Sequence, residues 1–425
     1  MGTLDALQKR PIKISRQLLV SSTIYTFPTK QVTPGLFAQD AEGIEALSWD
    51  TVGQYFPIRC ERAYMNNASI GALSTPVIDA VDRFMHDVRD HGRNNYPHWC
   101  KYADDVIKAR IARLIGARRE EIAFVKNTTE GLVNVANGFP WREGDNVILA
   151  DIEYPSNVYC WMKLAARGVS VRWVKNRQGR ILVDDIRAQM DERTRMVSLS
   201  AVQFSNGFRL DVAAVAALCA ERGAYLNLDA IQWAGALAMD VEALGVHFLS
   251  VGGHKWMLAP IGTGFFYCRR DVLELLDPPS VGYHSVTSPD EDHMDYVLEY
   301  RKDAGRFEEA LANFTGLWGL DTAVRIQLAL GSQRIEQHIM NLTGHAVEAL
   351  LQKGYVVVSP QGAEERSGNL SFRHPGGVDV YAIAAQLREE GVDVAVRGGN
   401  LRMSATYFND LADVDRMIAA LPGAA

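Results

Sequence analysis

The 425-residue sequence lacks the features that mark several protein classes. It has no apolar run of the roughly 20 residues that a membrane-spanning helix needs, and its N-terminus has no clean apolar segment followed by a small-residue cleavage site. The 44 basic and 51 acidic residues are spread evenly, without a basic stripe, and give a net charge of −7. We therefore expect a soluble, cytoplasmic protein that binds neither nucleic acid nor membrane.

Cysteine and histidine are also sparse. The ten histidines form no cluster, so no metal is expected. The cysteines are odd in number and widely spaced, which fits neither a disulfide framework nor a zinc site. Reduced thiols that pack as small apolar residues are the expectation for all five: Cys60, Cys100, Cys160, Cys219 and Cys268.

From about Glu121 to Cys268 the sequence alternates short apolar, β-branched runs with helical patterns. Seven strands are predicted, at 121–125, 146–150, 169–174, 196–202, 224–229, 248–252 and 264–268. Because helical segments separate the early strands, the pattern predicts an α/β fold with a mainly parallel seven-stranded sheet and helices on both faces. A loop rich in Gly and Pro joins the last two strands, which leaves the final strand free to run antiparallel.

The pattern changes after the polar segment 287–296. Two long helices near 315–331 and 334–353 come first, and a few short strands and helices follow. This order is typical of a smaller α+β domain. We expect an N-terminal arm at 1–75 that packs on the small domain, a large domain at 76–300 that holds the sheet and a small C-terminal domain at 301–425.

Polar residues follow the first two strands at the sheet edge where doubly wound folds bind ligands. Asn127 can cap a helix while Glu130 reaches back, and Thr128 and Thr129 then form an anion cup suited to a phosphate. Most such caps bind nothing. Tyr154 offers a ring that could stack on a planar ligand, although ordinary packing explains it as well.

A carboxylate and an amine follow the later strands. Asp229 ends the fifth strand, with Gln232 three residues on, and a helix cap is the simple alternative for this acid. Most of the ten positions on either side of Lys255 hold apolar residues or glycines, and the only other titratable side chains among them are His247 and His254. Burial lowers the pKa of a lysine and frees its amine to attack carbonyls, whereas the alternative is a side chain that reaches the surface.

One ligand would use the cup, the ring, the acid and the amine together. Pyridoxal 5′-phosphate (PLP) needs a lysine for its aldehyde, an acid for its pyridine nitrogen, a stacking surface and a phosphate site. Binding of a nicotinamide cofactor typically requires a G-x-G-x-x-G motif, and binding of a nucleoside triphosphate requires a P-loop. Neither motif occurs in the sequence.

The run "LNLDAIQWAGALAMDVEALGVHFLSVGGHKWMLAPIGTGFFYCRR" carries a D-x-x-Q, a G-H-K and a glycine-led strand. It resembles the centre of class V, fold-type-I PLP enzymes, the group that holds cysteine desulfurases, kynureninase and isopenicillin N epimerase. The segments "NNASIGALS", "NTTEGLVNVANGF", "EYPSNVYCWM" and "SAVQFSNGFRLDV" extend the likeness over about 60 to 400, closest to the isopenicillin N epimerase-like branch. The resemblance implies the PLP-dependent transferase fold of type I.

The resemblance also implies roles for individual residues. Lys255 would carry PLP as an aldimine and move the proton at the substrate α-carbon. Asp229 would pair with the pyridinium, Gln232 would contact the ring hydroxyl and Tyr154 would stack on the ring. The implied phosphate ligands are Thr128, Thr129 and His254. Arg402, in "LRMSATYFND", would grip the substrate α-carboxylate, and Asn67 would also contact the substrate.

Three departures from the family pattern matter. Gly252 stands where the family usually has a phosphate-binding serine, so Ser250 or a residue of a partner subunit would substitute. The segment "RFEEALANFTG" resembles the one by which a second subunit reaches the phosphate, but "ALAN" replaces the usual G-T-P, so Thr315 is the expected contact to the partner's phosphate in the homodimer that the resemblance implies. The loop "VRGGN" before Arg402 contains no cysteine, which disfavours desulfurization through a persulfide on the enzyme.

The expected function is that of a PLP-dependent enzyme acting at the α-carbon of an amino acid, as an aminotransferase or a β-eliminating C–S lyase. Epimerization or racemization of the isopenicillin N epimerase type is an alternative. A non-catalytic PLP-binding module is another, but such a module has no need of Lys255, Asp229 and Arg402 together.

Overall fold

The computed structural model describes residues 48–287 and 296–424. All of them belong to one compact unit. The first 47 residues of the arm expected at 1–75 lie outside the described residues, and so does most of the polar segment 287–296. Within the described ranges, none of the helices has both the length and the hydropathy needed to cross a bilayer.

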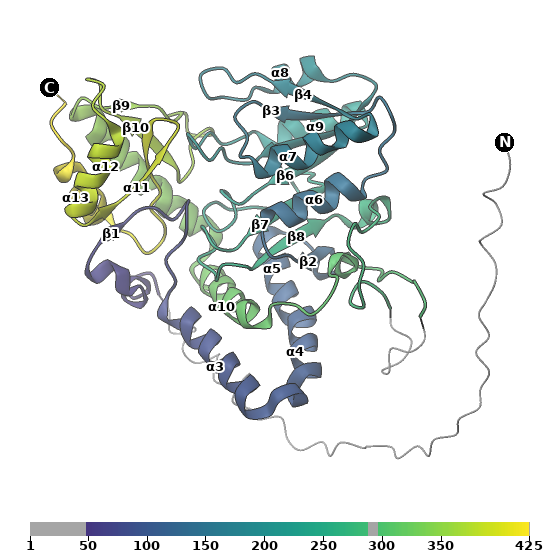
Figure 1. Cartoon of the computed structure of the whole chain (residues 1–425). Coiled ribbons are helices and arrows are strands. Elements are labelled where there is room, and N and C mark those ends of the chain that lie inside the picture. Colours follow the sequence, from purple (N-terminus) through teal and green to yellow (C-terminus); the bar gives the residue numbers. More distant parts are fainter. Residues whose placement is uncertain (1–47, 288–295, 425) are drawn as a thin grey trace, which may run out of the picture. The chain divides into compact units, whose positions relative to one another are not determined.

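A seven-stranded sheet forms the centre of this unit (Figure 1). Its strands are β2 (Ile122–Phe124), β3 (Asn146–Ala150), β4 (Ser170–Val174), β5 (Thr194–Ser200), β6 (Tyr225–Asp229), β7 (Phe248–Gly252) and β8 (Gly264–Cys268). They lie in the order β2-β8-β7-β6-β5-β3-β4. Only β8 runs against its neighbours β7 and β2, and the remaining pairs are parallel. The predicted seven-stranded, mainly parallel sheet is confirmed.

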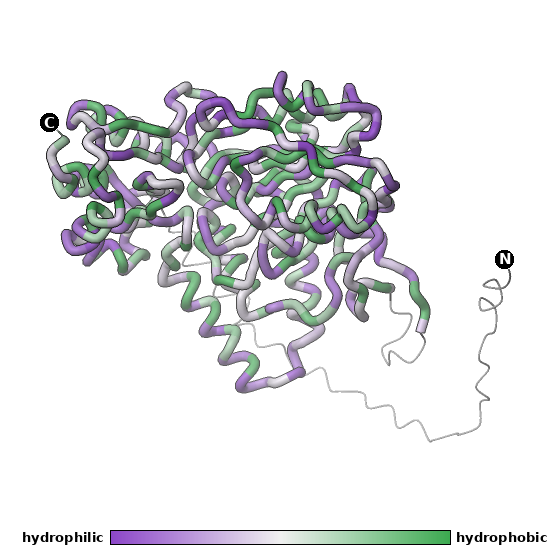
Figure 2. Tube along the Cα trace, turned by 45° about the horizontal axis from the view of Figure 1, so that its top comes forward, coloured by the Kyte–Doolittle hydropathy of each residue, from purple (hydrophilic) through white to green (hydrophobic). Residues whose placement is uncertain are grey.

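Both faces of the sheet are covered, as the near-continuous apolar strands predict. Along β3, Val147 and Leu149 pack into one hydrophobic cluster, whereas Ile148 and Ala150 pack into the other. Neighbouring residues of a strand point to opposite faces, so each face buries its own set of side chains. Figure 2 shows the strands as mostly hydrophobic and the outer helices as mixed.

Two groups of helices cover the two faces. Residues of α6 (Thr128–Gly138) and α7 (Ser156–Met162) pack into the cluster that holds Val147. Residues of α8 (Val183–Gln189) and α9 (Val212–Arg222) pack into the cluster that holds Ile148. Short 3₁₀ turns lie at Val52–Tyr55, Pro57–Cys60, Gly92–Asn95, Arg119–Glu121, Lys163–Arg167, Arg270–Leu275 and Ala304–Phe307.

The sequence analysis missed the helices before the first sheet strand. These are α3 (Thr75–His91), α4 (Tyr96–Tyr102) and α5 (Lys108–Ile115), with a π-helical turn at Ala103–Ile107 between the last two. The long α10 (Phe314–Leu330) packs against α3 and α5. Aromatic side chains of these helices contact one another, with the rings of Phe84 and Trp318 4.7 Å apart between centroids.

The C-terminal part has its own sheet and core. An antiparallel sheet in the order β12-β13-β10-β9 is built from β9 (Val356–Val357), β10 (Leu370–Arg373), β12 (Ala395–Arg397) and β13 (Asn400–Met403). Its helices are α11 (Ser332–Gln352), α12 (Val380–Glu389) and α13 (Leu411–Ala420). The smaller α+β part predicted from the sequence is therefore present.

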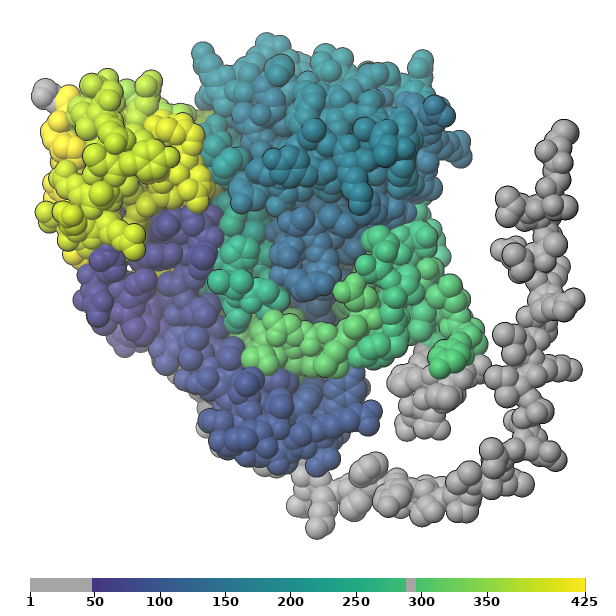
Figure 3. Space-filling view, viewed as in Figure 1, coloured from purple at the N-terminus to yellow at the C-terminus, as the bar shows by residue number. Residues whose placement is uncertain are grey.

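Residues from the N-terminal side join this C-terminal part. The two-residue strand β1 (Ala63–Tyr64) pairs in parallel with β11 (Val392–Asp393). In Figure 3 the first described residues lie against the C-terminal residues, which agrees with this pairing. The domain boundaries expected at 75 and 300 stay a prediction.

A buried ion cluster ties α5 to β2. Lys108 Nζ lies 2.6 Å from Asp104 Oδ1 and 2.8 Å from Glu308 Oε1, and the Lys108 side chain is only 3% exposed. Glu308 also accepts a hydrogen bond from the amide of Phe124, at 2.8 Å. Burial acts to lower the pKa of Lys108, but the two carboxylates outweigh it and hold the pKa above its usual value.

We predict that Lys108→Ala lowers the free energy of unfolding by about 3–5 kcal/mol, because Glu308 then stays buried without its cation. The matched control is Lys101→Ala, which removes an ion pair with Asp105 from a side chain that is 78% exposed. It should change the free energy by less than about 1 kcal/mol. Urea unfolding measures both, and equal effects would contradict the role given to the buried pair.

Candidate active site

A cavity of about 400 Å³ opens beyond the carboxyl ends of the central strands. Ligands bind at this edge in doubly wound folds. Its lining comes from the first turn of α6, from segments that follow β3, β5, β6 and β7, from β12 and β13, and from the stretch after β1. The lining residues are Ala68, Ser69, Ile70, Asn127, Thr128, Thr129, Tyr154, Ser156, Phe204, Asp229, Ile231, Gln232, His254, Lys255, Arg397 and Arg402.

Lys255 lines this cavity and keeps only part of its surface accessible. Its Nζ lies 5.5 Å from the centre of the Tyr154 ring, within range of a cation–π contact. Burial lowers the pKa of Lys255 to about 8; Asp229 opposes this shift, while Arg402 and Arg397 add to it. Near neutral pH the uncharged fraction of the amine is therefore far larger than that of a solvated lysine.

The backbone around Lys255 is held closely by the stretch that follows β1. The amide of Gly71 donates to the carbonyl of His254, at 2.7 Å. A Cβ at position 71 would lie 2.2 Å from the carbonyl oxygen of Lys255, so only glycine allows the approach. The close approach of the Lys255 backbone thus explains why "NNASIGALS" has a glycine at position 71.

Asp229 ends β6 inside the same cavity and is buried. One of its oxygens accepts a hydrogen bond from the amide of Ile231, at 3.1 Å. The residues that follow form turns and not a helix, so Asp229 is not a helix cap. Burial raises the pKa of Asp229, and Ile231 and Lys255 offset the shift only in part. A cationic hydrogen-bond donor in the cavity would stabilise the ionised carboxylate.

The first turn of α6 forms the expected cap with one difference. Asn127 Oδ1 accepts from the amide of Glu130, at 3.0 Å, but the Glu130 carboxylate accepts from the amide of Lys126 and not from that of Asn127. Thr129 Oγ1 donates to Ser156, whereas Thr128 Oγ1 is buried and has no hydrogen-bond partner among the described residues. An acceptor such as a phosphate oxygen would complete this site.

Neither Gly252 nor Ser250, both on β7, offers a hydroxyl to a phosphate in the cavity. A Cβ at Gly252 would lie 3.1 Å from Ile231 and 3.2 Å from the His254 ring, which leaves little room for a serine. Ser250 faces α6, because a Cβ at Gly131 would lie 2.4 Å from its Oγ, and Ser250 does not line the cavity. His254 does line it, and burial together with Lys255 lowers the pKa of its ring.

Arg402, on β13, reaches the cavity from the C-terminal sheet. It is 1% exposed and donates to the carbonyl of Phe204, at 2.6 Å, and to Ser69 Oγ, at 3.0 Å. Its Nε has no partner among the described residues. Burial, followed by the charge of Arg397, lowers the pKa of Arg402 to about 9. The guanidinium is held in place while part of it stays open to an anion.

Gln232 also lines the cavity, but most of its amide is used by the protein. Its Nε2 donates to the carbonyl of Ala68, at 3.2 Å. Its Oε1 accepts from Trp256, at 2.8 Å, and from Asn369, at 3.2 Å. One N–H of Gln232 is left for a ligand hydroxyl.

Two residues expected at the site are not among those that line the cavity. Asn67 is buried, and its amide group contacts the backbone of Ser404 and Ala72. Thr315 lies at the start of α10, with its hydroxyl 3.6 Å from the sulfur of Met85. Their roles toward substrate and partner subunit stay predictions.

Arg397 lines the cavity beside Arg402 and was not predicted as a site residue. In the sequence, "VRGGN" was interpreted only as a loop without a cysteine. The signal was available, since two consecutive glycines between short strands are typical of a tight hairpin, which brings the flanking residues together. Gly398 and Gly399 have φ of 56° and 74°, and Arg397 pairs with Asn400 across the turn.

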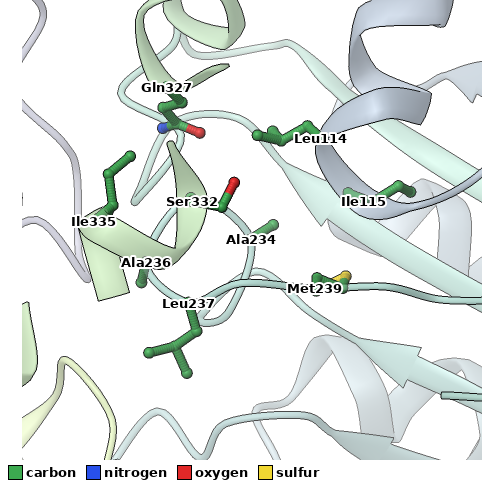
Figure 4. Close-up of a pocket in the computed structure, with 10 residues that line it drawn as sticks. Leu114, Ile115, Ala234, Ala236, Leu237, Met239, Gln327, Ser332 and Ile335 are labelled. Carbon is green, nitrogen blue, oxygen red and sulfur yellow. The ribbon is translucent and has the colours of Figure 1, made fainter. Parts of the chain in front are cut away.

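The cysteines stand apart from this site. None of the described residues that line the cavity is a cysteine. All five are free, and burial raises the pKa of Cys160 and Cys219 to about 12. A second cavity, between α5, the turn at 234–239 and the α10–α11 junction, measures only about 10 Å³ (Figure 4). It holds one water at most, so the Lys255 cavity is the better candidate site.

Comparison with known proteins gives a consistent result. The chain is 32% identical over 390 residues to a probable cysteine desulfurase of Methanothermobacter thermautotrophicus, covering 86% of this chain and 95% of that protein. It is similar to the solved structure of a C-DES mutant with glycine covalently linked to the PLP cofactor (TM-score 0.80, 23% identity, 86% of this chain and 97% of that one). A complex of the cystine C–S lyase C-DES with cysteine persulfide matches equally well (TM-score 0.79, 23% identity, 86% and 98%).

These structural likenesses confirm the expected type I fold. Residues 63–416 match the profile of the family described as aminotransferase class-V, a range that runs from β1 to α13 and includes every residue that lines the cavity. With this match over most of the chain, and with the relative at 32% identity, the chain belongs to the aminotransferase class-V family.

Proposed function

We propose that this protein is a PLP-dependent enzyme that acts at the α-carbon of an amino acid, as a C–S lyase or an aminotransferase. The observation that carries the proposal is Lys255, an amine with a lowered pKa in the same cavity as a buried acid. The names of the relatives, cysteine desulfurase and cystine C–S lyase, favour cleavage at the β-carbon. Epimerization of the isopenicillin N epimerase type has no such support.

The groups that line the cavity fit PLP. The partnerless hydroxyl of Thr128, together with Thr129 and His254 in the lining of the same cavity, would hold the phosphate. Asp229 would face the ring nitrogen, Tyr154 would cover the ring and Gln232 would bind the ring hydroxyl. Lys255 would bind the aldehyde carbon. When bound, PLP supplies an electron-withdrawing ring that stabilises negative charge at the substrate α-carbon.

The protein's own groups account for the remaining requirements of the reaction. Arg402 orients the substrate by its α-carboxylate, and its contacts to Phe204 and Ser69 keep the guanidinium fixed. The Lys255 amine takes the proton from the α-carbon, a task suited to a pKa of about 8. Asp229 would keep the ring nitrogen protonated, because a buried carboxylate is stabilised by a cation next to it.

We predict that PLP added to the purified protein gives a visible imine band that Lys255→Ala abolishes. Borohydride reduction followed by digestion should place the pyridoxyl group on the Lys255 peptide. Lys163→Ala, which removes an exposed lysine, is the matched control and should keep the band. Label spread over surface lysines, or a colourless wild-type protein, would overturn the proposed function.

The same reaction has a pH dependence that reports the environment of Lys255. Because the pKa is lowered from 10.5 to about 8, the reactive free amine builds up as pH rises through 8. The initial rate of imine formation should therefore rise between pH 6.5 and 8.5 and level off above about pH 9. A rate that keeps rising to pH 10.5 would indicate an ordinary solvated lysine.

We predict that the enzyme works without a cysteine of its own. Alkylation by iodoacetamide, which reaches the exposed Cys60 and the half-buried Cys100, should leave activity toward sulfur amino acids within about twofold of the untreated protein. No protein-bound persulfide should be found by mass spectrometry during turnover. Loss of activity on alkylation, together with a persulfide on one of these residues, would contradict this prediction.

We further propose that the protein is a homodimer in the cytoplasm. Ile261 and Leu311 are 69% and 59% exposed, and Gly262 and Leu311 line one surface pocket, close in the chain to Thr315. Exposed apolar side chains of this kind are typical of a surface that another subunit covers. Light scattering at micromolar concentration should give twice the monomer mass of 47.1 kDa. A monomer mass would rule out sites shared between subunits.

A further inference from the structure

The second arginine of the cavity lies on the same face of the C-terminal sheet as the first. In the β12–β13 hairpin, Ala395 lies opposite Arg402 and Arg397 lies opposite Asn400. Residues two apart on a strand point to the same face, so Arg397 and Ala395 share a face of the sheet. Arg402 lies opposite Ala395 and therefore points to that face too. The turn at Gly398 and Gly399 adds only two residues between the strands, which keeps the two guanidinium groups together.

The two guanidinium groups share one neutral acceptor. Nη2 of Arg402 and Nη2 of Arg397 donate to the hydroxyl of Ser69, at 3.0 and 3.3 Å. Arg397 also donates to its own chain at Val396. A hydroxyl offers lone pairs but no charge, so this contact orients the two cations without neutralising them.

Neither arginine forms an ion pair with a carboxylate within residues 48–287 and 296–424. Asp229 is the single acidic residue among the described residues that line the cavity, against Lys255, Arg397 and Arg402. The charge of Arg397 contributes to the lowered pKa of Arg402, which shows that the two cations repel each other. A bound anion would remove that repulsion.

A single carboxylate on the substrate would occupy only one of the two arginines. An α-carboxylate needs one guanidinium for a bidentate contact, and the buried, fixed Arg402 is suited to it. The proposed site for the cofactor phosphate is at the first turn of α6, which is a different element from the hairpin that carries the two arginines. Arg397 therefore remains available, and it is the more accessible of the two arginines.

We propose that Arg397 binds an acid group on the substrate side chain, so that the preferred substrates are amino acids with two acid groups. This inference rests on the proposed function, because it takes Arg402 as the α-carboxylate site. It narrows the substrate class from any amino acid to those whose side chain carries a carboxylate or a similar anion.

Equilibrium binding of unreactive acids tests the proposal without any turnover. Calorimetric titration of the PLP-loaded protein should show that glutarate binds about 10- to 100-fold more tightly than its monoamide, glutaramate, since a charge-assisted contact is replaced by a neutral one. In Arg397→Gln the preference should fall below about threefold. Arg397→Lys should keep part of it, and Arg373→Gln, an exposed arginine on β10, should keep all of it.

The visible imine band distinguishes a failure of the inference about Arg397 from a failure of the proposed function. If Arg397→Gln keeps the band and loses the preference for glutarate, the inference is supported. If wild type binds both acids equally, or Arg397→Gln keeps the preference, Arg397 does not read a second acid group and the inference fails while the proposed function stands. If wild type forms no band, the proposed function fails, and the titration of the cofactor-free protein still decides the role of Arg397. As a functional readout, kcat/KM for aspartate, glutamate and cysteine sulfinate should fall by the same factor in Arg397→Gln, with little change for asparagine and glutamine.

Discussion

The removal of one amine from water is the constraint on which the rest of the site depends. Lys255 lies in the turn that follows the buried strand β7, and the loss of hydration lowers its pKa to about 8 against the attraction of Asp229. The sheet makes this possible because both of its faces are covered, so its carboxyl edge is the place where polar side chains meet a ligand. The close approach of Gly71 then fixes the backbone that carries the amine.

The cavity combines groups from two parts of the chain with different tasks. The large sheet and its adjoining segments supply Thr128, Asp229 and Lys255, the groups proposed to hold the cofactor. The C-terminal hairpin supplies Arg397 and Arg402, the groups proposed to bind the carboxylates of a substrate. The stretch after β1 connects the two, since Ser69 contacts both arginines while Gly71 contacts the backbone at His254. A change in this short stretch would therefore affect cofactor and substrate groups at once.

Much of this arrangement could be predicted from the sequence, because it depends on local patterns. The apolar runs gave the seven strands, and the order of strands and helices gave the edge at which Asp229 and Lys255 meet. Helices α3 to α5 were missed although their amphipathic pattern, with Pro76 in the first turn of α3, is present in the sequence. The two glycines after Arg397 indicate a hairpin, but which cavity this hairpin lines depends on how the C-terminal sheet packs, and the free Thr128 hydroxyl also depends on tertiary packing.

The two-glycine turn between Arg397 and Arg402 has a consequence for the fate of whatever is cleaved from a substrate. The side chains that the hairpin brings to the cavity are Arg397 and Arg402, and neither is a nucleophile that could accept a leaving group. A sulfur species or other fragment expelled from the β-carbon would thus stay unattached and diffuse into the surrounding water. Any acceptor further along would have to capture it from solution, without a covalent hand-over from this protein.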